Sequence, residues 1–344
     1  MAPNVEIMKR MKSNFAERFS IKDLGGLNHI LGIRVTRNRE ERSITLDQTA
    51  AVINMLKEYD NTIERDTPLH TKSARKLRTY KEEAEPKTIE NYQSIIGSLM
   101  YFSRWTRTDI SSSVGLLSRF ARNPGPEHIQ QLMHLLGYLM KNPSLGMQLK
   151  NNNTHSKVIM HADADWAEDP EDRKSTSGFV ICFEGNPIIW KSTKQDCVSK
   201  STMHAMVTCL TEGEWTCNLL AEIGYDYETP ILYCDNQAAI RVISRGDAEN
   251  FSKHIGVKLR TLHDAVQQEL LDLKYICSED NLADVFTKPL ESNKHRKSVA
   301  LLNMSCLDRG SMESIYPSIA RLTLSEKTFS ERIDPVYQNA MQEI

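Results

Sequence analysis

Hydrophobic residues recur every three or four positions through much of the first 140 residues, which is the spacing of one face of an α-helix. The helices that this spacing predicts cover residues 4–19, 48–59 and, in at least two segments interrupted at 123–126, residues 92–139. Two short apolar runs between the first two helices, at 30–35 and 43–46, predict strands of a hairpin. The first part of the chain is therefore predicted to be mainly helical.

After about residue 155 the pattern changes to short apolar runs that are separated by turn residues. These runs predict strands at residues 158–160, 179–183, 188–190, 231–234 and 273–276, and helices at 201–223, 237–243, 255–270 and 282–286. Three strands come first, and helices then alternate with the remaining strands. This order favours an α/β fold with a mixed sheet and helices on its faces.

Polar stretches divide the chain. Residues 61–90 show little apolar periodicity and contain Pro68 and Pro86, which predicts a linker or a long loop. A second boundary is expected near residues 142–153, and the last residues form a polar tail that we expect to be disordered. These boundaries predict five units: residues 1–60, the linker at 61–90, a helical region at 91–150, an α/β domain at 155–305 and the tail at 306–344.

Charge and cysteine content bear on the partners and the compartment. The net charge of −2 argues against a strong nucleic-acid binder, but the first 150 residues are net basic and the remainder is net acidic. A basic half is suited to a phosphate backbone, although chance asymmetry of solvated faces explains it equally well. The seven cysteines lack zinc-site spacing, so we expect reduced thiols in an intracellular protein, cytoplasmic or nuclear. No apolar run predicts a transmembrane helix or a secretory signal, so no membrane partner is expected.

Three carboxylates follow or end predicted elements of the α/β region: Asp163, Asp235 and Asp284. Loops that follow neighbouring strands converge at the carboxyl edge of an open sheet, so these side chains are expected to lie near one another. Carboxylates gathered in this way repel one another unless a cation neutralises them, and Mg²⁺ or Mn²⁺ suits oxygen ligands. From spacing alone, turn formation or helix capping is the more common role of aspartates at such positions.

Several motifs around these acids occur in a recognisable order. They are His161-Ala162-Asp163-Ala164-Asp165-Trp166-Ala167, Arg173-Lys174-Ser175-Thr176-Ser177-Gly178, Trp190-Lys191-Ser192-Thr193-Lys194-Gln195, Tyr233-Cys234-Asp235-Asn236-Gln237-Ala238, Ser252-Lys253-His254-Ile255 and Asn281-Leu282-Ala283-Asp284 with Thr287-Lys288-Pro289-Leu290. In order and spacing they resemble the RNase H domain of copia-type LTR retrotransposon Pol polyproteins. The resemblance implies an RNase H-like mixed five-stranded sheet with flanking helices.

Upstream blocks resemble the reverse-transcriptase part of the same polyprotein, just after its catalytic palm motif. They are Ile21-Lys22-Asp23-Leu24-Gly25, Leu31-Gly32-Ile33, Tyr92 to Tyr101, Arg107-Thr108-Asp109-Ile110 and Ser118-Arg119-Phe120. The likeness spans roughly residues 5–305. It implies that residues 1–60 are a palm-end and thumb fragment and that 91–150 are a helical connection region.

The resemblance also assigns roles within the acidic site. It implies that Asp163, Asp235 and Asp284 are the first, third and fourth catalytic acids, which hold Mg²⁺ or Mn²⁺. The second acid is a glutamate in a block that usually reads Ser-Thr/Ser-x-Glu-Ala-Glu-Tyr, and here Met206 stands in its place. A thioether is a poor ligand for Mg²⁺, so Met206 is expected to be a core residue and the metal site to be weakened.

Basic residues near the acids are candidates for contact with nucleic acid. Arg173 and Lys174, in a turn before a predicted strand, are placed to contact phosphate, and the alternative is an exposed turn. Lys253 and His254 lie between the third and fourth acids, where they are placed to touch a phosphate or orient a water, and a surface role is the alternative.

The first functional hypothesis is a Pol fragment whose domain descends from a two-metal endonuclease that cuts RNA in RNA–DNA hybrids, now impaired at Met206. The family's polymerase metal motif lies upstream of the matching region, so no polymerase centre is expected. The second hypothesis is a non-catalytic module that binds RNA–DNA hybrid or duplex nucleic acid. The third is a remnant of a decayed element with no selected role.

Overall fold

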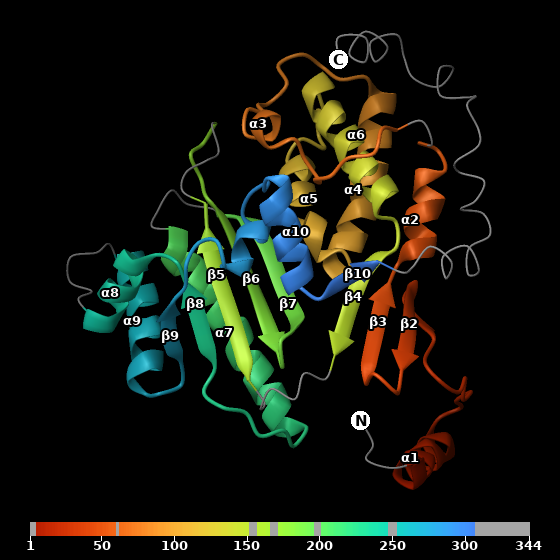
Figure 1. Ribbon diagram of the computed structural model, residues 1–344, viewed down its shortest axis with the longest axis vertical. Coiled ribbons are helices and arrows are strands. Elements are labelled where there is room, and N and C mark those ends of the chain that lie inside the picture. Colours follow the sequence, from red (N-terminus) through yellow and green to blue (C-terminus); the bar gives the residue numbers. More distant parts are fainter. Residues whose placement is uncertain are drawn as a thin grey trace.

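Two five-stranded sheets organise the protein in the computed structural model (Figure 1). The structure describes residues 5–59, 62–150, 157–165, 171–195, 201–246 and 253–306. None of the described helices is long and apolar enough to cross a membrane. The expected tail beyond Cys306 lies outside the described residues.

The second sheet has the strand order β7-β6-β5-β8-β9. Its strands are β5 (Val158–Ala164), β6 (Thr176–Phe183), β7 (Asn186–Lys194), β8 (Ile231–Cys234) and β9 (Asp272–Tyr275). The first three pair antiparallel, whereas β5, β8 and β9 run parallel to one another. This five-stranded mixed sheet with flanking helices confirms the predicted RNase H-like α/β fold class.

Both faces of this sheet are covered, as strand β6 shows. Phe179 and Ile181 point into a core beneath α7 (Ser201–Glu222), while Val180 and Cys182 pack on the opposite face against residues of η2 (Leu282–Phe286). Alternating residues of one strand therefore enter two different cores, which is why β6 reads as a continuous apolar run. The helices α8 (Gln237–Arg245) and α9 (Lys253–Gln267) pack on each other at the β9 edge (Figure 1).

The helical part has a core of its own. Its elements are α2 (Thr49–Leu56), α3 (Thr71–Ala74), α4 (Pro86–Trp105), η1 (Thr108–Ile110), α5 (Ser111–Ser118) and α6 (Pro126–Lys141). Helix α4 begins at Pro86, six residues before its predicted start, because proline is well placed in the first turn of a helix. Leu69 and Leu77, from the stretch predicted as a linker, are buried in this core. That stretch is a connection that packs against the helices.

The first sheet contains strands from both the beginning and the end of the described chain. Its order is β1-β2-β3-β4-β10, with β1 (His29–Ile30), β2 (Ile33–Asn38), β3 (Ser43–Asp47), β4 (Leu145–Lys150) and β10 (Met304–Cys306). The pattern did not predict β4, β10 or α10 (Ser292–Leu301), which leads into β10. Because β10 pairs with β4, residues that follow the second sheet complete the first one, so the two parts are structurally interlocked.

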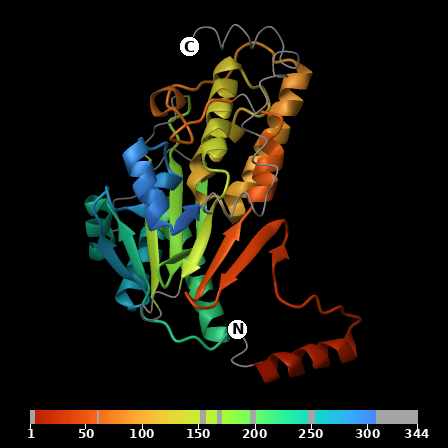
Figure 2. The ribbon, with the colours of Figure 1, turned by 45° about the vertical axis from the view of Figure 1, so that its right-hand side comes forward.

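The strand expected at residues 30–35 is interrupted. Leu31 and Gly32 both have a positive φ, of 50° and 70°, and they turn the chain so that β1 pairs back on β2. Before this hairpin, α1 (Val5–Arg18) stands away from the rest of the chain (Figure 2).

Candidate metal centre

Three aspartates meet at one edge of the second sheet. Asp163 lies near the end of β5, Asp235 directly follows β8, and Asp284 lies in η2. Strands β5 and β8 are parallel neighbours, so their carboxyl ends meet at the same edge. One carboxylate oxygen of each aspartate lies within 4.8 Å of the others. The structure thus brings together the three acids that the motifs predicted.

Close packing holds Asp284 near the strand ends. The Asn281 side-chain amide donates to the carbonyl oxygen of Ala162 at 3.3 Å, and its oxygen accepts from the backbone N–H of Ala283 at 3.1 Å. On the other side, η2 lies directly on Gly178 of β6, where a Cβ atom would come within 2.8 Å of the Phe286 Cβ. Only a glycine at this position permits that approach.

Burial and hydrogen bonds set the charge states of the two buried aspartates. Burial raises the pKa of Asp163 to about 7, and its hydrogen bond with Asp284 and the repulsion from that carboxylate add to the shift. For Asp284, burial also acts to raise the pKa. The hydrogen bond with Asp163 and the charges of Lys288 and Lys294 outweigh it, so the pKa of Asp284 lies below its ordinary value.

Two lysines offset part of the negative charge of the three aspartates. The Lys288 ammonium lies 3.1 Å from Asp284 Oδ1 and 3.8 Å from Asp163 Oδ2, and the Lys294 ammonium contacts Asp284 Oδ2. The hydroxyl of Thr287 donates to Asp163 Oδ2 at 2.9 Å. The sequence reading missed these three residues, although Lys288 is four positions after Asp284, a spacing at which opposite charges commonly meet.

Helix α7 has a methionine where the resemblance places the second catalytic acid, a glutamate. Met206 is fully buried and belongs to the core that also holds Ala162 and Cys234, the residues just before Asp163 and Asp235. Its neighbour His204 is half-buried and shares a 2.7 Å hydrogen bond between its Nδ1 and the Lys258 ammonium. Among the described residues, the cluster of potential metal ligands contains only the three aspartates.

The four basic residues that were predicted to contact nucleic acid lie in different parts of the structure. Arg173 is exposed, with a positive φ of 54°, and the Lys174 ammonium lies 3.9 Å from Asp172. Arg173 and the half-buried Lys174 precede β6, and their contact with nucleic acid stays a prediction. Lys253 and His254 begin α9, but their side chains lie outside the described residues.

The residues present suit one hard cation. Asp163, Asp235 and Asp284 offer oxygen ligands, as Mg²⁺ and Mn²⁺ prefer. Among the described residues, the position of the family's glutamate offers only the soft sulfur of Met206, and both lysines contact Asp284. The three carboxylates therefore suit a divalent cation.

The protonation of Asp163 gives a pH-dependent stability that can be measured. An unfolded aspartate loses its proton near pH 4, whereas folded Asp163 keeps its proton up to about pH 7. Folding therefore binds a proton between these values, and the free energy of unfolding falls as the pH rises through them. We expect Asp163→Asn, which cannot ionise, to raise the melting temperature in EDTA, and by more at pH 8 than at pH 5.

The control for this prediction is Asp226→Asn, which changes an exposed aspartate. Its melting temperature should equal that of the unaltered protein at both pH values. A gain for Asp163→Asn that is equal at pH 5 and pH 8 contradicts the assignment of a raised pKa to Asp163.

Comparison with known proteins identifies the family. The retrovirus-related Pol polyprotein from transposon TNT 1-94 of Nicotiana tabacum is 33% identical over 307 residues, which cover 87% of this chain and 23% of that protein. The chain belongs to the Pol polyproteins of copia-type retrotransposons. The Pol polyprotein from transposon RE1 of Arabidopsis thaliana is 33% identical over 282 residues, covering 80% of the chain and 19% of the relative. The chain thus spans about a fifth of the length of these curated Pol relatives.

Other comparisons add less to this assignment. No protein-family model matches the chain. A solved structure of LC11-RNase H1, isolated from compost by a metagenomic approach, is 16% identical and aligns with 42% of this chain and 99% of that one. Its TM-score of 0.31 is too low to support the fold, which rests instead on the order and direction of the strands.

Proposed function

We propose that residues 155–305 of this Pol chain form an RNase H-like module that holds one divalent cation and cleaves the RNA strand of RNA–DNA hybrids slowly. One observation carries the proposal: oxygen atoms of three aspartates converge within 4.8 Å of one another. Met206, at the position of the family's glutamate, is buried in the core that holds Ala162 and Cys234. The family membership supports hybrid as the substrate class. The preserved acids favour metal binding, and the missing carboxylate favours impaired cleavage.

Each part of the site has a role in this proposal. Asp163 and Asp235 bind the cation, and Asp284 completes its oxygen ligands. Thr287 and Asn281 orient these groups, since Thr287 donates to Asp163 and Asn281 fixes η2 against β5. Lys288 and Lys294 neutralise Asp284, which stabilises the acid cluster and lowers its affinity for a cation. A bound divalent ion supplies an activated water and stabilises the leaving oxygen.

The test measures metal binding and cleavage with the full chain. We expect Mn²⁺ to raise the melting temperature at pH 8 because a ligand that binds only the folded state stabilises it. End-labelled hybrid should be cut slowly in Mg²⁺ or Mn²⁺ and not at all in EDTA. Asp235→Asn should abolish both effects, and Asp226→Asn should preserve them.

Rapid cleavage by the unaltered protein contradicts the proposed impairment. A melting temperature that Mn²⁺ leaves unchanged contradicts the metal site. Hybrid binding without either metal effect favours the alternative of a non-catalytic nucleic-acid-binding module.

A further inference from the structure

Helix α1 has an apolar face that its own chain leaves exposed. Met8, Met11, Phe15 and Phe19 recur every three or four residues, so they lie on one side of the helix. Their exposed fractions lie between 45% and 61%. Single exposed apolar side chains are common on protein surfaces, but a row of four large ones is typical of a surface that binds another protein. Because α1 stands away from the other elements, this face is accessible (Figure 2).

Positive charge borders the apolar face of α1. Lys9 and Arg18 are exposed, and on a helix with 3.6 residues per turn they fall on opposite margins of this face. Within the described part of the chain, neither forms an ion pair or a side-chain hydrogen bond. Lys12, by contrast, is paired with Asp23 at 2.8 Å. Two cationic groups of α1 are therefore available to a partner.

A second exposed apolar row lies near the C-terminal end of α7. Trp215, Leu219 and Ile223 are four residues apart and are 57%, 40% and 63% exposed. Ile223 follows the last residue of the helix, but its backbone N–H still donates to the carbonyl oxygen of Leu219 at 3.1 Å, so it continues the helical turn. Cys217 and Leu220 point into the core, which places the three exposed residues on the outer side of the helix. We call these three residues the α7 patch.

Negative charge surrounds the α7 patch. Residues 201–240 contain no lysine or arginine but six aspartates and glutamates. Glu214 and Glu222 adjoin the patch and are exposed, and among the described residues neither has an ion-pair partner. Glu228, further along the chain, is paired with Lys157 at 3.6 Å. The α7 patch therefore suits a partner that is both apolar and basic.

The face of α1 and the α7 patch are complementary in charge and similar in apolar spacing, and we propose that they bind each other between two copies of the chain. Helix α1 of each copy packs on the α7 patch of the other. The two basic residues of α1 then lie beside the two glutamates of α7, so opposite charges steer association while apolar burial stabilises the contact. A reciprocal contact of this kind closes into a dimer and leaves no surface for a third copy. Both surfaces lie at the same end of the molecule, as this arrangement requires (Figures 1 and 2).

Sedimentation velocity of the full chain in EDTA measures the association. We expect a dimer whose fraction grows with protein concentration and falls at high salt, because salt screens exposed charges. Trp215→Ala should weaken dimerisation by at least about tenfold, because large aromatic residues contribute most to the affinity of an interface. Trp105→Ala is the matched control, since it removes a tryptophan of α4 that is 44% exposed and lies outside both surfaces. It should leave dimerisation unchanged.

Charge reversal tests whether these two surfaces meet. A variant with Lys9→Glu and Arg18→Glu should stay monomeric, because like charges then face each other. A variant with Glu214→Lys and Glu222→Lys should stay monomeric for the same reason. A mixture of the two variants should dimerise, since opposite charges are restored in both contacts. Circular dichroism and the melting temperature of each variant show that it remains folded.

Several results would overturn the proposal. One is an unaltered chain that stays monomeric at every concentration. Another is a dimer that Trp215→Ala weakens no more than Trp105→Ala does, and a third is a mixture of the charge-reversed variants that fails to dimerise. A monomer that becomes less compact in Trp215→Ala places α1 on its own chain and also contradicts the dimer. The dimer requires no metal ion, so these results are independent of the proposed cleavage.

Discussion

Met206→Glu is expected to raise the rate of hybrid cleavage in Mn²⁺ by about 10- to 100-fold or more, since even indirect metal contacts are worth that much. Met206 belongs to the same hydrophobic core as Ala162 and Cys234, the residues that precede two of the three clustered aspartates. We expect a carboxylate at this position, where the family has its glutamate, to add a fourth oxygen donor. The measurement is the initial rate on end-labelled hybrid at saturating metal.

The same substitution should make stability depend on metal. Without a cation, a carboxylate at the fully buried position of Met206 costs several kcal/mol or takes up a proton. With Mn²⁺ the negative charge is compensated. The melting temperature of Met206→Glu should therefore lie below that of the unaltered protein in EDTA and should rise more when Mn²⁺ is added.

Met203→Glu is the matched control. Met203 belongs to the same helix and the same core and is 3% exposed, but it lies three residues before the position of the family's glutamate. We expect it to lose stability without gaining activity. Equal cleavage by Met206→Glu and the unaltered protein, or an equal gain in Met203→Glu, contradicts the proposed role of this position.

The second sheet was largely predictable because its signals are local. Strands such as residues 158–160 and 179–183 are apolar runs, and turn residues bound them. The order of strands and helices then leaves few ways to build a mixed sheet. By contrast, β4 and β10 were not predicted. Strand β10 has only three residues, and β4 is stabilised by partners about 100 to 160 residues away in sequence, at Ser43–Leu46 and Met304–Cys306.

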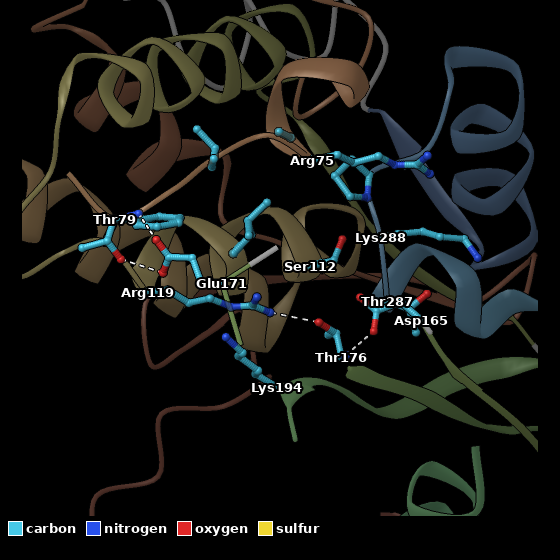
Figure 3. Close-up of a pocket in the computed structure, with 15 residues that line it drawn as sticks. Arg75, Thr79, Ser112, Arg119, Asp165, Glu171, Thr176, Lys194, Thr287 and Lys288 are labelled. Atoms are coloured by element: carbon cyan, nitrogen blue, oxygen red, sulfur yellow. Dashed lines mark hydrogen bonds between the residues drawn. The ribbon is translucent and has the colours of Figure 1, made fainter. Parts of the chain in front are cut away.

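Part of the candidate site was also predictable from local sequence. The motifs pointed to Asp163, Asp235 and Asp284, because sequence likeness reports residue types at set positions. The ion pairs of Lys294, ten residues after Asp284, depend on how α10 packs beside η2. A cavity lined by residues of both parts, among them Arg75 and Lys194, is a further case, because it forms only where the two parts dock (Figure 3).

A buried ion pair at the junction of the two parts leads to the second large expected effect. Asp109 accepts from Arg107 Nε at 3.0 Å, from Arg107 Nη2 at 2.7 Å and from the Tyr138 hydroxyl at 2.8 Å. Both members of the pair are about 1% exposed. Burial acts to raise the pKa of Asp109, but the guanidinium of Arg107 outweighs it and keeps the pKa below its ordinary value. From α10, the His295 ring hydrogen-bonds the Asp109 backbone carbonyl at 3.4 Å, which links this pair to the C-terminal elements.

Asp109→Ala is therefore expected to lower the free energy of unfolding by about 3–5 kcal/mol, because it leaves the Arg107 guanidinium buried without its partner. Urea denaturation followed by circular dichroism measures this loss. Asp66→Ala makes the same change in an exposed pair, in which Lys141 lies 2.5 Å from Asp66, and it should leave the midpoint nearly unchanged. Arg107→Met combined with Asp109→Leu removes both charges and should recover much of the lost stability. If Asp109→Ala costs no more than Asp66→Ala, the buried pair does not hold the helical part to α10.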